Sequence, residues 1–100
     1  MTVEILYSEV CNLFGDIGNV RYLEKSLPDS EFIYTRLGEK PYFAENKVNL
    51  IYLGSMSESV QALVIKELEP YKSKLSNMIA DGTAFIITGS AVDIFGKSII

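Results

Sequence analysis

The chain has 100 residues, a formal net charge of −4, no histidine and one cysteine, and 48% of its residues are hydrophobic. This length corresponds to one domain with a single modest core, and the scattered Lys and Arg residues argue against a nucleic-acid-binding surface. No segment approaches the roughly 18 consecutive apolar residues of a membrane span, and the first residues do not resemble a signal peptide, so we expect a cytoplasmic protein without a membrane span.

The first half of the chain predicts an alternation of strands with one helix. The helix has apolar residues at helical spacing and ends before Pro28. The segment between the second and third strands is polar and contains Pro41, which favours a loop. In chain order the expected elements are a strand over 3–7, a helix over 17–27, a strand over 31–37, a loop over 38–47 and a strand over 48–53.

The second half predicts two helical segments separated by Pro70. Ser55 and Ser57 are both candidate N-caps, and Glu58 follows Ser55 at the spacing of a capping box. The apolar face expected for the first helix consists of Val60, Leu63, Val64 and Leu68. The second helix is expected to end at the turn formed by Asp81 and Gly82.

After that turn, the apolar run 83–88 predicts a strand buried on both faces. Gly89 and Ser90 interrupt the run, and residues 91–95 predict a short helix. A strand, a sharp turn of small residues and a helix together have the geometry of a nucleophile elbow. The same arrangement also occurs as a plain strand-to-helix turn, which carries no chemistry.

Strands that alternate with helices predict an α/β fold of the flavodoxin-like kind, with a mostly parallel sheet flanked by helices. Binding sites in such sheets lie outside the carboxyl ends of the strands. The candidate substrate-binding residues are therefore Gly54, Ser55, Gly89 and Ser90. The turn that begins at Gly54 could present N–H groups to an oxyanion or could simply start a helix.

Catalytic chemistry has little support from the residue types present. Cys11 is a possible thiol nucleophile, but without a histidine a packing role is favoured. Ser90 likewise has no base in the chain. The spacing of Gly15 and Gly18 is too short for a dinucleotide-binding motif, and we expect no cofactor and no metal.

Three segments carry a resemblance to a known family. They are residues 12–19 (NLFGDIGN), Gly54 with Ser57 and 61–63, and the end of the elbow at 95–97. In this order and spacing the chain resembles the amino-terminal half of a class I glutamine amidotransferase domain of the cobyric acid synthase-like type. Within that type it is most similar to the amidotransferase subunit of the lipid II isoglutaminyl synthase. The resemblance implies that 1–100 form a single domain, which is the amino-terminal half of a longer amidotransferase-like domain.

The chain departs from this family at the catalytic positions. Counting back from Phe95 places Gly89 where the family has its cysteine nucleophile, and a shift of one residue would place Thr88 or Ser90 there. Gly54 matches the family's oxyanion turn, but Ser55 and Met56 replace glycines. The family's histidine and its acid partner come from the other half of its domain. We therefore expect no catalytic residue in this chain.

The expected function is that of a glutamine amidotransferase-like pseudoenzyme or partner-binding subunit, related to cell-wall or cobalamin-type amidation. The resemblance implies a Mur-ligase-like synthetase as partner. A homo-oligomer is also expected, because half of a sheet-based domain leaves strand edges or a sheet face uncovered. The alternative is a flavodoxin-like domain that binds a small ligand or an anion without catalysis.

Overall fold

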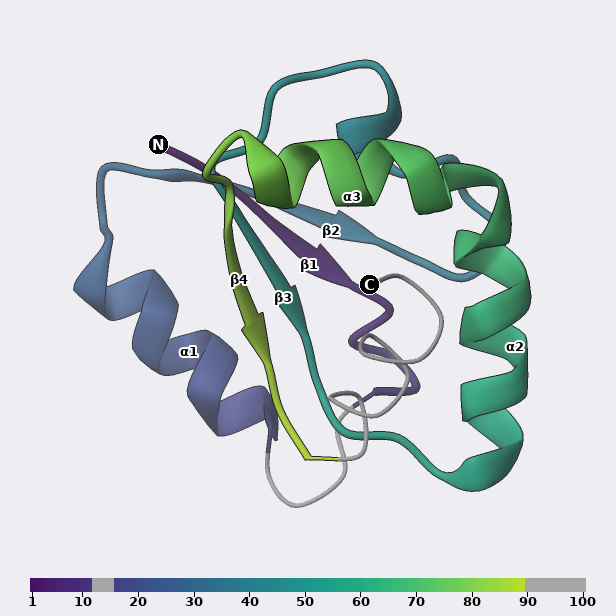
Figure 1. Cartoon of the computed structure of the whole chain (residues 1–100). Helices are drawn as coiled ribbons and strands as arrows, with labels where there is room; N and C mark the ends of the chain where they lie inside the picture. The colour runs from purple at the N-terminus through teal and green to yellow at the C-terminus, as the bar shows by residue number, and fades with distance from the viewer. Residues whose placement is uncertain (12–15, 90–100) are drawn as a thin grey trace.

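A computed structural model describes residues 1–11 and 16–89. It shows a four-stranded parallel sheet with helices on both faces, which confirms the predicted flavodoxin-like α/β arrangement (Figure 1). The elements are β1 (Thr2–Leu6), α1 (Asp16–Ser26), β2 (Glu31–Thr35), η2 (Tyr42–Ala44), β3 (Leu50–Leu53), α2 (Glu58–Leu68), η3 (Glu69–Tyr71), α3 (Lys72–Ala80) and β4 (Ala84–Ile87). The predicted helix over 91–95 lies outside the described residues.

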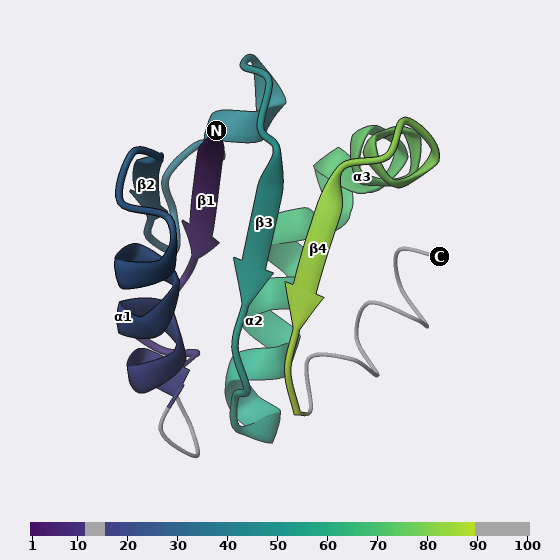
Figure 2. The ribbon, with the colours of Figure 1, turned by 90° about the vertical axis from the view of Figure 1, so that its left-hand side faces the viewer.

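The sheet has the strand order β2-β1-β3-β4, and all three pairings are parallel. In the register, Leu6 lies opposite both Thr35 and Leu53, and Leu53 lies opposite Ile87. The carboxyl ends of the strands therefore meet at one edge of the sheet (Figure 2). This is the edge at which the sequence predicted the site.

Alternation along the strands divides the core into two layers. Val3, Ile5, Leu50 and Tyr52 pack with Val20 on the side of α1. Leu6, Ile51 and Leu53 point to the other side and pack under α2 and α3 with Val64 and Leu75. β1 and β3 are thus the strands buried on both faces, as expected for the centre of a parallel sheet.

The prediction that the strand after Gly82 is buried on both faces is wrong. In β4, Phe85 and Ile87 are partly buried, whereas Ala84 is exposed and Ile86 is 36% exposed. The reason is topological, since β4 follows β3 in the strand order and α1 lies over the β1 side of the sheet (Figure 2). Within the described residues, no helix covers the side of β4 that faces the same way as α1. The homo-oligomer expected from uncovered sheet surface stays a prediction.

The first turn of α2 also differs from the expected capping box. Ser57 is the N-cap, and its hydroxyl accepts a hydrogen bond from the Val60 N–H at 3.4 Å. Ser55 lies two residues earlier and is buried, so it does not cap the helix. On the predicted apolar face, Val64 and Leu68 are buried but Leu63 is 52% exposed.

No helix in the described part of the chain is long and apolar enough to cross a membrane.

The segment predicted as a polar loop contains a short helix, η2, with a fully buried Phe43. The ring of Phe43 packs edge-on against Tyr71, with centroids 5.8 Å apart. The segment is polar overall, so its composition did not predict that the buried Phe43 side chain would hold the β2–β3 connection against η3.

A buried carboxylate on β1 holds η2 in place. Glu4 is fully buried, and its oxygens accept hydrogen bonds from the N–H groups of Tyr42 and Phe43, both at 2.9 Å. The Thr35 hydroxyl donates to the same carboxylate at 2.5 Å. The first N–H groups of a helix have no partner within the helix, and Glu4 supplies one from a different element. These three bonds compensate the removal of a carboxylate from water.

Candidate functional site

The turns after β3 and β4 lie against each other at the carboxyl edge of the sheet. The Thr88 N–H donates to the Leu53 carbonyl at 3.1 Å, which continues the strand pairing by one residue. The next residues along each chain segment bring Ser55 beside Gly89. Three of the four predicted site residues (Gly54, Ser55 and Gly89) therefore gather at this edge, while Ser90 lies outside the described residues.

Gly89 has a backbone φ of +55°, a region that residues with a Cβ rarely adopt. Thr88 precedes it at the end of the pairing with β3. The sharp change of direction after β4 is therefore at Gly89. Glycine reaches a positive φ at little cost, so it suits a sharp turn directly after a strand; the register of the elbow stays a prediction.

Residue 89 has no space for a side chain in this turn. A Cβ added to Gly89 would lie 1.9 Å from Ser55 Oγ and 2.9 Å from Ser55 Cβ. Ser55 is 2% exposed, so its side chain fills the space between the two turns. The Ser55 hydroxyl thus lies where the Cβ of a side chain at residue 89 would be.

The loop after β1 joins the same edge through Cys11. Cys11 is 2% exposed, and its thiol donates to Met56 Sδ at 3.9 Å. This environment is apolar and closed to solvent, whereas a reactive cysteine is usually partly exposed and near positive charge. The contact ties the loop after β1 to the turn after β3, in agreement with the packing role predicted for Cys11.

Tyr7 is a further unusual residue at this edge, and no sequence pattern pointed to it. It follows β1 with φ +55°, an uncommon value for a bulky residue, and is fully buried. Its hydroxyl has no hydrogen-bond partner within the described residues. Burial, and after it the negative charges of Glu67 and Glu4, raise the pKa of the Tyr7 hydroxyl above its usual range. A buried hydroxyl without a partner is a destabilising feature.

We expect Tyr7→Phe to raise the free energy of unfolding by about 1 kcal/mol, because it removes an unsatisfied polar group and keeps the ring. The matched control is Tyr34→Phe, since the Tyr34 hydroxyl donates to Glu24 at 2.5 Å. That change should lower stability by up to about 1 kcal/mol. Urea denaturation of both variants measures whether each change raises or lowers the free energy of unfolding. A loss of stability in Tyr7→Phe would show that the Tyr7 hydroxyl has a hydrogen-bond partner in solution.

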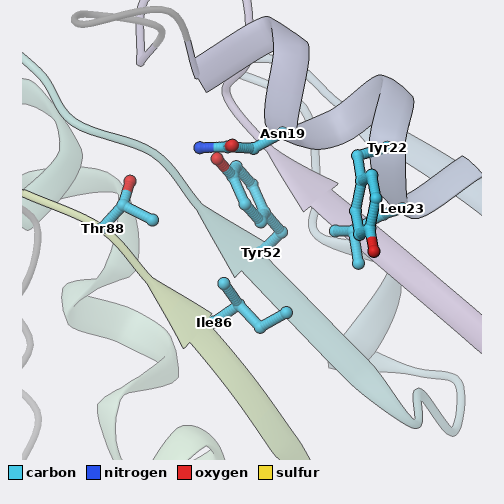
Figure 3. A pocket seen from close by; sticks show the side chains of 6 residues that line it. All are labelled: Asn19, Tyr22, Leu23, Tyr52, Ile86 and Thr88. Carbon is cyan, nitrogen blue, oxygen red and sulfur yellow. The ribbon is translucent and has the colours of Figure 1, made fainter.

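An open cavity of about 250 Å³ lies between α1 and the uncovered side of β4 (Figure 3). Its floor is formed by Tyr52 and Ile86, and Thr88 extends it toward the candidate site. The lining residues are Asn19, Tyr22, Leu23, Tyr52, Ile86 and Thr88. Its character is therefore mainly apolar, with hydroxyl and amide groups from three elements, as in many small-ligand sites.

A second hollow, of about 380 Å³, lies near the β2–η2 connection and is lined by charged residues. They are Glu39, Lys40, Lys66 and Glu67, with Gly38, Pro70 and Tyr71 completing the lining. Lys40 forms an ion pair with Glu45, and Glu67 accepts a hydrogen bond from the Gly38 N–H at 3.3 Å. The lining charges are of both signs, and the expectation that any ligand binds beside Gly54 and Gly89 stays a prediction.

The fold and this edge define a flavodoxin-like α/β domain whose strand-end turns are closely packed. Comparison of the sequence with models of known protein families and with curated proteins gave no match. In residues 1–11 and 16–89, no group of three or more Cys, Asp or Glu side chains could hold a metal ion.

Proposed function

We propose that this chain is a glutamine amidotransferase-like domain that does not hydrolyse glutamine and acts by binding a partner protein. The observation that carries the proposal is the turn at Gly89. Gly89 has a positive φ directly after the strand, yet Ser55 fills the space that a nucleophile side chain would need. A sharp turn directly after β4 that leaves no space for a nucleophile is what an inactive amidotransferase-like domain would have, and this supports the proposal.

Glutamine hydrolysis requires catalytic groups that this chain does not supply. A thiol attack on glutamine needs general-base assistance, typically worth about 10²- to 10⁴-fold, and oxyanion donors worth about 10²- to 10³-fold. The chain contains no histidine, and its one cysteine is buried at position 11. Neither contribution is available in the form in which the resembling family supplies it. The partner implied by the resemblance is a Mur-ligase-like synthetase.

An ammonia-release assay with glutamine tests the catalytic part. We expect no ammonia above background from the native chain, and none from Gly89→Cys, because the new thiol would have no base and no space. Cys11→Ser is the control that removes the native thiol. Glutamine-dependent ammonia from the native chain that disappears in Cys11→Ser would overturn the proposal.

The partner-binding part needs a separate measurement. The chain is mixed with a Mur-ligase-like synthetase from the same organism, and size-exclusion chromatography records whether the two elute together. Co-elution supports the proposal, and separate elution at tens of micromolar of each protein contradicts it.

The second candidate function, binding of a small ligand without catalysis, is favoured by the cavity between α1 and β4. In that case Ile86→Arg should abolish ligand binding and leave synthetase binding unchanged.

A further inference from the structure

Ser55 and Gly89 come from different turns but compete for one space. β3 and β4 are paired through Leu53 and Ile87, so the residues that follow them are held side by side. The hydrogen bond from the Thr88 N–H to the Leu53 carbonyl fixes this arrangement up to the residue before Gly89. The two turns cannot separate without breaking the end of the strand pairing.

Rotation of the Ser55 side chain does not free the space. It would move Oγ away from its position 1.9 Å from an added Cβ at residue 89, but Ser55 Cβ would remain 2.9 Å away. Carbon atoms that are not bonded to each other pack at about 3.5–4.0 Å. Since Cβ is fixed by the backbone, only removal of the Ser55 side chain or movement of a turn relieves the overlap.

We propose that Ser55 is the residue that determines whether the turn after β4 can carry a side chain. With serine at position 55, residue 89 must be glycine; with glycine at position 55, the space becomes available to residue 89. This inference deepens the proposed function, on which it rests for its meaning, by naming the side chain that excludes a nucleophile from the elbow. The steric relation itself depends only on the packing of the two turns.

A double-mutant cycle tests the relation by thermal unfolding of Gly89→Ala, Ser55→Gly and the double variant. Gly89→Ala combines an overlap with an unfavourable positive φ, and we expect it to lower Tm by about 10–20 °C. Ser55→Gly should lower Tm by only about 5 °C. The double variant should unfold at a higher temperature than Gly89→Ala, because the overlap is removed and only the backbone strain and the smaller Ser55→Gly loss remain.

Gly38→Ala is the matched control for that strain. Gly38 has φ +88°, but an added Cβ there would meet nothing within 4 Å. Its Tm loss should be well below that of Gly89→Ala, and it should add to Ser55→Gly without coupling. If Gly89→Ala does not fold, a folded double variant still supports the inference.

Three results would overturn the inference. They are equal Tm losses for Gly89→Ala and Gly38→Ala, a double variant no more stable than Gly89→Ala, and a double variant that fails to fold while Gly38→Ala folds. The outcome is separate from that of the proposed function. Absence of coupling removes the role of Ser55 and leaves the ammonia result unaffected, whereas ammonia release by the native chain leaves the steric coupling unaffected.

Discussion

Replacing Glu4 with alanine is expected to lower the free energy of unfolding by about 3–5 kcal/mol, a large part of the stability of a domain of this size. The carboxylate is fully buried and accepts hydrogen bonds from Thr35, Tyr42 and Phe43. Alanine would leave two backbone N–H groups and one hydroxyl without their acceptor, and a cavity beside them. Urea denaturation followed by circular dichroism measures the change.

Two further variants separate the lost hydrogen bonds from the lost volume. Glu4→Gln keeps the shape of the side chain but replaces one acceptor oxygen with a donor, so it should cost about 1–3 kcal/mol. Glu31→Ala, at an exposed position on β2, should change stability by less than about 0.5 kcal/mol. A Glu4→Ala variant as stable as Glu31→Ala would show that the carboxylate does not hold η2.

Leu68→Ala is expected to lower the free energy of unfolding by about 2–5 kcal/mol, because it removes a leucine that is 1% exposed and leaves a cavity under α2. The matched control is Leu63→Ala on the same helix. Leu63 is 52% exposed, and alanine is the better helix former, so the control should stay within about 0.5 kcal/mol of the native chain.

This pair of variants tests which face of α2 points to the sheet. Comparable losses at both positions would contradict the observed orientation and restore the face expected from the sequence. The four positions 60, 63, 64 and 68 all have the spacing of an apolar face, so periodicity alone does not distinguish the buried residues from Leu63. The distinction depends on how α2 lies over Ile51 and Leu53.

The sequence by itself determined the class of the fold and the edge at which the site residues meet. Strand and helix periodicity are local properties of the chain, so the order of the strands and α-helices through β4 was predictable, with boundaries displaced by one or two residues at most ends. The break at Pro70 and the turn at Gly82 were predictable for the same reason. Because carboxyl ends of parallel strands share one edge, the meeting of Gly54, Ser55 and Gly89 followed from the fold class.

Only the tertiary structure decided which surfaces are covered and which side chains meet across the sheet. The sequence of β4 predicts a fully buried strand, but its second face is buried only if a helix lies over that edge of the sheet. In the structure, α1 packs against β1 and β3 instead. Glu4 reads as one charge in an apolar strand, and its role appears only when β1 is placed beside β2 and η2. Ser55 reads as a helix cap, yet it fills the space at Gly89 because the pairing of β3 with β4 brings two distant turns into contact.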